Sequence, residues 1–98
     1  MLALLIVTVI GVGGPPGHPR PLRNATVFYK RGQLPPGYSY LPPPPLKTDK
    51  RGRVEIRLSP GAYRIKAGLG PLGQRPCSSR TVTMTGKTQR VRLTCQIR

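Results

Sequence analysis

The most constraining feature of the sequence is the segment from Thr48 to Ala67, TDKRGRVEIRLSPGAYRIKA. On both sides of Pro60-Gly61, apolar residues occupy every second position and the residues between them are charged. A period of two is typical of a strand that is buried on one face only. Proline fixes φ before a bend and glycine accepts a positive φ, so Ser59–Ala62 predicts a turn between two strands.

The same alternation recurs in three further segments, at residues 25–30, 80–85 and 90–98. Gly86-Lys87-Thr88 between the last two predicts a turn, so we expect these strands to form a hairpin. The residues expected to face the interior are Ala25, Val27, Tyr29, Val82, Met84, Val91, Leu93, Cys95 and Ile97. No segment carries a helical period of 3.6 residues, and the sequence therefore predicts an all-β domain.

The N-terminal apolar run, Leu2–Val12, admits three interpretations. It is shorter than the ~20 residues that a membrane-spanning helix needs. Its length fits the hydrophobic region of a secretory signal with a cleavage point near Gly14, so we expect residues 1–13 to be a signal peptide. Because the run is rich in β-branched residues, a buried β-strand is the second interpretation. A retained anchor is the third.

Proline-rich stretches divide the rest of the chain. Residues 14–23 contain four prolines and are expected to form a leader that stays outside the sheets. The domain is expected at residues 24–98. Within it, Leu34–Pro45 interrupts the strand pattern, and Pro42–Pro45 predict a polyproline II stretch. We expect a stiff edge or loop there, with a docking site for a proline-binding module as the alternative.

Cys77 and Cys95 are the only cysteines of the chain. An even pair in a small exported domain predicts a disulfide. In a regular hairpin, the residue numbers of two inward residues that lie opposite each other have a constant sum. That sum would be odd here, because inward Val82 has an even number and inward Val91 an odd one. Since 77 plus 95 is even, we expect Cys77 to lie outside the regular ladder. Two reduced thiols are the alternative.

The charge balance points to a polyanionic partner. The chain has 17 Lys and Arg against two acids, a net charge of +15. Such a balance suits a protein beside nucleic acid, an anionic envelope polymer or anionic headgroups. A bias of the genome toward arginine, glycine and proline codons is the other explanation. The candidate polyanion patch comprises the cations at outward strand positions, Arg53, Arg57, Arg64, Lys66, Arg90 and Arg92.

Catalysis finds little basis in the sequence. General acid/base chemistry needs a histidine or paired carboxylates, and the single histidine, His18, lies in the proline-rich leader. Asp49 is expected to be a turn residue that accepts hydrogen bonds from nearby backbone amides. Glu55 lies between two arginines and is expected to neutralise them. His18, Cys77 and Cys95 are too few for a zinc site, so we expect no enzyme activity, no cofactor and no metal.

The central segment resembles a known family. Its Thr-Asp-x-x-Gly, alternating strand and Leu-x-Pro-Gly-x-Tyr are similar to the signature of the transthyretin-like, carboxypeptidase regulatory-like domain. The tail from Cys77 to Arg98 is similar to the ending of small exported bacterial members. This resemblance covers residues 25–98 and implies a small Greek-key β-sandwich of about seven strands without catalysis. It further implies opposite sheets for the strands that flank Pro60-Gly61, and structural turn positions at Asp49, Gly52, Pro60, Gly61 and Tyr63.

These observations predict an exported, disulfide-closed module with a structural or binding role at the cell surface or envelope. Its expected partner is an anionic envelope polymer or another protein, and no transmembrane span is expected. The alternative is an intracellular basic protein that binds nucleic acid. In that case the first residues form a buried strand and the cysteines are reduced.

Overall fold

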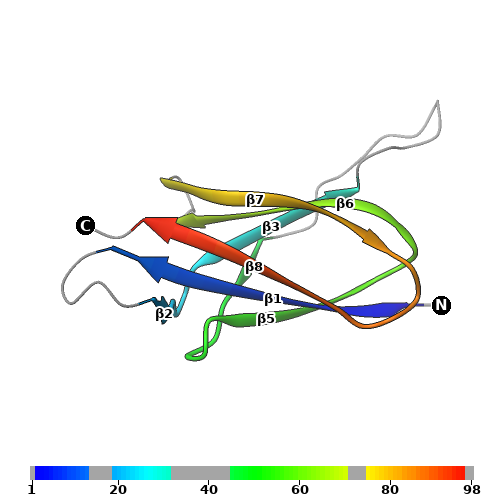
Figure 1. The fold of residues 1–98 in the computed structure, drawn as a ribbon, viewed down its shortest axis with the longest axis horizontal. Helices are drawn as coiled ribbons and strands as arrows, with labels where there is room; N and C mark the ends of the chain where they lie inside the picture. The colour runs from blue at the N-terminus through cyan, green and yellow to red at the C-terminus, as the bar shows by residue number, and fades with distance from the viewer. Residues whose placement is uncertain (1, 14–18, 32–44, 71–74, 97–98) are drawn as a thin grey trace.

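The computed structural model describes residues 2–13, 19–31, 45–70 and 75–96, which form two stacked β-sheets (Figure 1). The β1 sheet contains β1 (Ala3–Val12), β2 (Arg20–Pro21), β5 (Arg53–Leu58) and β8 (Gln89–Gln96). The β6 sheet contains β3 (Thr26–Arg31), β4 (Leu46–Lys47), β6 (Gly61–Leu69) and β7 (Arg75–Met84). The predicted all-β sandwich is confirmed, with eight strands in the described residues instead of about seven.

β1 is the central strand of its sheet. Residues Ala3–Thr8 pair antiparallel with β5, and Ile10 and Gly11 pair with β2. On its other side, residues Leu5–Val12 pair with β8 in parallel. Among the described strands, β2, β5 and β8 pair with β1 alone. This sheet is therefore held together through its first strand.

The N-terminal apolar run thus lies inside the fold, as the buried-strand interpretation predicts. Its side chains alternate between the interior and the outer face, and Leu5, Val7 and Val9 have no exposed surface. β-branched residues favour such a strand because their stiff side chains pack well on a pleated surface. Removal of residues 1–13 as a signal peptide would take away the strand that joins β5 to β8. No helix long and apolar enough to cross a membrane occurs in the described parts of the chain.

The core lies between the sheets and is built from the inward positions of both. Its completely buried side chains are Leu5, Val7, Val9, Ala25, Val27, Ile65, Leu93 and Cys95. Period-two patterning predicts the inward positions well: Val27, Met84 and Leu93 are buried, and Tyr29 and Val82 pack partly buried against the core. Ile97, also predicted to face inward, lies outside the described residues.

Four connections between the described strands cross from one sheet to the other, and two of them bear on the sequence predictions. β5 belongs to the β1 sheet and β6 to the other, so the strands that flank Pro60-Gly61 lie in opposite sheets, as the family resemblance implies. β7 pairs with β6, whereas β8 pairs with β1. The predicted hairpin of the last two strands is therefore wrong, because the turn at Gly86 carries the chain from one sheet to the other.

The leader also differs from its prediction in one place. Arg20 and Pro21 pair with Gly11 and Ile10 as the short strand β2. A proline is tolerated there because the pairing involves two residues at the side of a sheet, where a missing amide donor costs little. Residues 34–44 of the second proline-rich stretch lie outside the described residues.

Candidate binding surface

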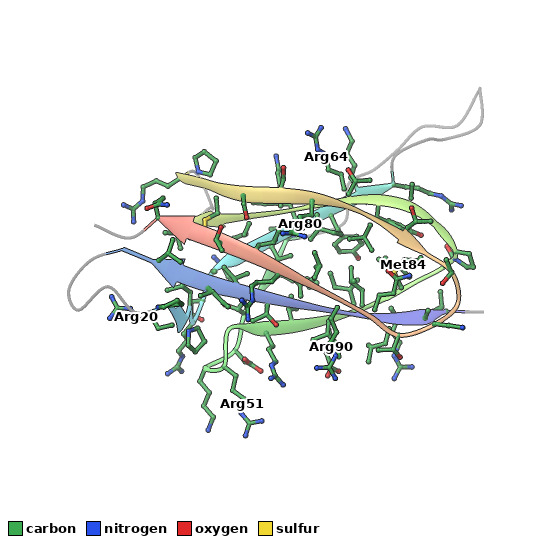
Figure 2. All side chains as sticks on the ribbon, viewed as in Figure 1. Arg20, Arg51, Arg64, Arg80, Met84 and Arg90 are labelled. Atoms are coloured by element: carbon green, nitrogen blue, oxygen red, sulfur yellow. A yellow bond between two sulfur atoms is a disulfide. The ribbon has the colours of Figure 1, made fainter. Side chains whose placement is uncertain are left out.

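The six cations of the candidate patch lie on two opposite faces of the sandwich. Arg53 and Arg57 of β5 and Arg90 and Arg92 of β8 belong to the β1 sheet, whereas Arg64 and Lys66 belong to β6. All six side chains are exposed. In Figure 2, Arg64 and Arg90 project from opposite sides of the molecule. The structure therefore divides the predicted patch into a set of four arginines and a separate pair.

The four arginines flank the outer side of β1, and we call this surface the arginine-framed face. Thr8 is paired with Arg53 on one side and with Arg92 on the other. Ile6 is paired with Glu55 and Arg90, and Leu4 is paired with Arg57. Because neighbouring strands are ~4.8 Å apart, the two flanking strands are separated by roughly 10 Å. Between them runs the outer stripe of β1, which is partly exposed and consists of Leu4, Ile6, Thr8, Ile10 and Val12.

The opposite face gathers cations around β6. Lys30 of β3 is paired directly with Arg64, and like charges in such a position repel one another. Phe28 is paired with Lys66, whose Nζ lies 5.4 Å from the ring centroid in a cation–π contact. The two acids of the chain, Asp49 and Glu55, both lie outside this sheet. Sequence reasoning missed Lys30 and Phe28, because the outward positions of β3 became meaningful only once its pairing with β6 was known.

Asp49 organises the turn before β5. Its Oδ1 accepts hydrogen bonds from the backbone N–H groups of Arg51, at 2.8 Å, and Arg53, at 3.1 Å. The backbone hydrogen bonds, first from Arg53 and then from Arg51, hold the pKa of the Asp49 carboxyl below its ordinary value. A carboxylate held in its ionised form is suited to closing a turn and has no proton to donate. Within the described residues, no three His, Cys, Asp or Glu side chains are grouped in a way that suits a metal ion.

Gly52, in the same turn, is packed against the centre of the β1 sheet. Its φ is +74°, and a Cβ at this position would lie 2.7 Å from the carbonyl oxygen of Val9 and 2.9 Å from Cβ of Pro21. The Gly52 carbonyl accepts a hydrogen bond of 2.7 Å from the Val9 N–H. Glycine is required here because the backbone of one strand touches that of the turn.

A surface hollow of about 550 Å³ adjoins this turn. It is lined by Arg23, Asn24, Thr48, Asp49, Lys50 and Arg51. The Oγ1 atom of buried Thr48 accepts from the Ala25 N–H at 2.9 Å and donates to the Leu22 carbonyl at 2.5 Å. Thr48 Oγ1 and Asp49 Oδ1 are thus already engaged within the protein, and the hollow offers exposed cations more than an organised polar site.

Tyr63, Gly61 and Ser59 shape the crossing from β5 to β6. The hydroxyl of buried Tyr63 donates a hydrogen bond of 2.9 Å to the carbonyl of Ser59. Gly61 has φ +145°, and a Cβ there would lie 3.2 Å from the Nη2 atom of Arg31. Arg31 donates from Nη2 to the carbonyl of Pro60 at 3.3 Å. These contacts tie the connection to the end of β3.

The predicted disulfide is present and joins the two sheets. Cys77 lies in β7 and Cys95 in β8, with their Cα atoms 4.6 Å apart. Beside it, the Ser78 Oγ accepts a hydrogen bond of 2.8 Å from the Thr94 N–H. Cys77 has no partner in the β6–β7 register, which shifts between Lys66 and Gly68, so it lies outside the regular ladder as expected. Cys95, in contrast, is paired with Gly11 in the β1–β8 ladder.

Comparison with known proteins shows a shared fold. No family model matches the chain, and no curated protein matches it in sequence. A solved structure of GBS52, the minor pilin of the gram-positive pathogen Streptococcus agalactiae, superimposes with a TM-score of 0.68 at 21% identity, covering 97% of this chain and 44% of that one. A DUF3823 family protein from Parabacteroides merdae superimposes with a TM-score of 0.57 at 17% identity, covering 96% and 45%. This chain therefore spans less than half the length of either, and the likeness concerns the β-sandwich fold.

Proposed function

We propose that this chain is an exported, non-catalytic β-sandwich module that contacts anionic polymers at the cell surface or envelope. The transthyretin-like, carboxypeptidase regulatory-like class is our proposal for the sandwich, on the strength of the segment from Thr48 to Tyr63. The Cys77–Cys95 disulfide supports export, because such bonds persist in oxidising compartments. The fold shared with a minor pilin supports a surface role.

The observation that carries the polyanion proposal is the excess of exposed cations on both faces, which the single acid between Arg53 and Arg57, Glu55, does not balance. Lys30 stands directly opposite Arg64 on one face. On the other face, Arg53 and Arg92 flank Thr8. Like charges directly opposite one another are destabilising, and an accumulation of cations on one face adds a weaker repulsion. A bound polyanion would relieve this repulsion on either face.

Salt dependence tests the proposal. The disulfide-intact chain should be retained on an immobilised polyphosphate column, and the logarithm of its binding constant should fall linearly with the logarithm of salt concentration. Substitution of Arg53, Arg92 and Arg64 by glutamine should lower that slope by about 0.9 for each phosphate that is no longer neutralised. Retention that does not depend on salt would contradict the proposal.

The nucleic-acid alternative has one structural point in its favour, the buried N-terminal strand. It also requires reduced cysteines, which the disulfide between β7 and β8 opposes. Mass spectrometry of the protein from its native source separates the two. We expect a chain that retains residues 3–12 and has no free thiol. Two free thiols would favour the intracellular alternative, and a chain that starts near Gly14 would show that the N-terminal run is cleaved.

A further inference from the structure

The outer stripe of β1 is unusual because apolar side chains occupy the solvent side of a strand. In a sandwich, outward positions are ordinarily polar and inward positions apolar. β5 and β8 follow this rule, with charged or polar side chains outward, and β6 follows it at Arg64 and Lys66. β1 does not, since Leu4, Ile6, Ile10 and Val12 lie outward and are partly exposed. Leu2, directly before the strand, is 62% exposed.

Arginines border this stripe along its first half. Leu4 is beside Arg57, Ile6 is beside Arg90, and Thr8 lies between Arg53 and Arg92. The second half has neutral borders, since Ile10 is paired with Thr94 and Val12 with Gln96. The surface therefore combines an apolar strip, roughly 27 Å long at ~3.3 Å per residue, with four cations and one acid, Glu55.

Arginine is well suited to this arrangement. Its guanidinium group forms bidentate hydrogen bonds with phosphate. Its aliphatic stem can lie along apolar surface while the charged head reaches outward. Phosphate groups and apolar chains occur together at the surface of a bilayer that contains anionic lipids. A soluble polyanion would neutralise the arginines and leave the apolar strip uncovered.

We propose that the arginine-framed face binds the surface of an anionic lipid bilayer, with the arginines on the phosphates and the outer stripe of β1 against the apolar boundary. This inference rests on the proposed function, because it names the anionic partner of one of the two basic faces. A second copy of the chain would fit poorly, since the same face would bring four arginines against four.

The β6 face serves as an internal control. Arg64 and Lys66 occupy alternate outward positions of β6, just as Arg90 and Arg92 do on β8. The position before them on the same face of β6 is Ala62. The residues paired with Arg64 and Lys66 on the neighbouring strands are one aromatic residue, Phe28, and the polar residues Lys30, Ser79 and Thr81. A partner that responds to charge alone would use both faces.

The test measures binding of the disulfide-intact chain to vesicles of phosphatidylglycerol and phosphatidylcholine, with pure phosphatidylcholine vesicles as reference. A near-surface cation strengthens binding roughly fivefold. Arg90→Gln with Arg92→Gln should therefore weaken binding to anionic vesicles about 30-fold. Arg64→Gln with Lys66→Gln should change it by no more than about threefold. Ile6→Thr with Ile10→Thr keeps β-branched residues and all charges, and should weaken vesicle binding about tenfold because less apolar surface enters the bilayer.

The second part of the test measures binding of the same protein to soluble polyphosphate. Binding to polyphosphate without binding to anionic vesicles would overturn the lipid proposal and leave the proposed function standing. Equal weakening in the two charge variants, or no effect of the Ile6 and Ile10 substitutions, would also overturn it. Binding to neither probe would overturn both proposals. Light scattering identifies the remaining competitor, because a dimer that dissociates on Ile6 and Ile10 substitution would assign the stripe to a second copy.

Discussion

Cys77 and Cys95 bring the last strand of one sheet against the last strand of the other, with Cα atoms 4.6 Å apart. β7 and β8 share no backbone ladder, and beside the disulfide the Thr94 N–H donates to Ser78 Oγ. The covalent bond thus closes one long side of the sandwich. In a domain of this size, such a bond is comparable with what the apolar core contributes to stability.

Loss of the disulfide should lower the free energy of unfolding by about 3 kcal/mol, because the unfolded chain regains the entropy of an open loop. Urea unfolding of wild type and of the Cys77→Ser, Cys95→Ser double variant measures this difference. A reducing agent should destabilise the wild type to the same extent and leave the double variant unchanged. Wild-type stability that does not respond to reduction would contradict the prediction.

The N-terminal strand provides a second prediction through two adjacent residues. Leu5 is fully buried, whereas Ile6 faces outward and is partly exposed. Leu5→Ala should cost about 2–5 kcal/mol of unfolding free energy, because it leaves a cavity in the core. Ile6→Ala is the matched control and should cost about 1 kcal/mol or less.

Denaturant unfolding of both variants, expressed with residues 1–13 present and confirmed by mass, supplies the measurement. If the N-terminal run did not pack into the domain, wild type and both variants would have the same stability. A large effect confined to Leu5 would show that β1 is an integral strand of the mature protein.

Alanine substitutions at Gly52 and at Gly86 distinguish the cost of a steric clash from the cost of backbone strain. Both have positive φ, +74° and +92°. A Cβ on Gly52 would meet the Val9 carbonyl at 2.7 Å, whereas a Cβ on Gly86 would meet nothing within 4 Å. Gly86→Ala should cost about 1–2 kcal/mol from the left-handed conformation alone, and Gly52→Ala about 3 kcal/mol or more, because the clash is added. Thermal unfolding of the two variants tests this order. Equal costs would mean that the turn moves away from β1 without penalty.

Strand identity could be predicted from the sequence where alternation is strong. Ile65 and Leu93 are buried, as the polar residues on either side of each predict, because these residues mark their strands as half-exposed. β1 gives no such signal, since a central strand that is apolar on both faces reads as a continuous apolar run and resembles a signal peptide.

The sheet to which each strand belongs could not be predicted. Alternation shows which side of a single strand faces outward, but not which strands pair with one another. Arg64 and Arg90 are both outward, yet they occupy opposite faces since β6 and β8 belong to different sheets. The β1–β8 pairing joins the two ends of the chain, and no local residue pattern encodes a contact of that separation. For the same reason, the six cations of the candidate patch were visible in the sequence while their division into two surfaces was not.

The lowered pKa of the Asp49 carboxyl predicts how the stability of the fold changes in acid. Backbone hydrogen bonds from Arg53 and Arg51 lower the pKa of its carboxyl from the ordinary 3.8, and the charges of the same two arginines add to the effect. Folding therefore favours the ionised carboxylate. Its contribution to stability is fully present above the unfolded pKa near 3.8 and is lost as the pH falls through the lower folded value.

Urea unfolding of wild type and Asp49→Asn between pH 7 and pH 2 tests this dependence. The wild type should be the more stable of the two at neutral pH by an amount that stays constant down to about pH 5 and shrinks below the carboxyl's ordinary pKa. Glu55→Gln is the matched control, because it removes the other acid of the chain and leaves the turn between Asp49 and Arg53 unchanged. A difference between wild type and Asp49→Asn that persisted undiminished to pH 2 would show that the carboxylate charge does not stabilise this turn, and that its geometry alone holds Gly52 against β1.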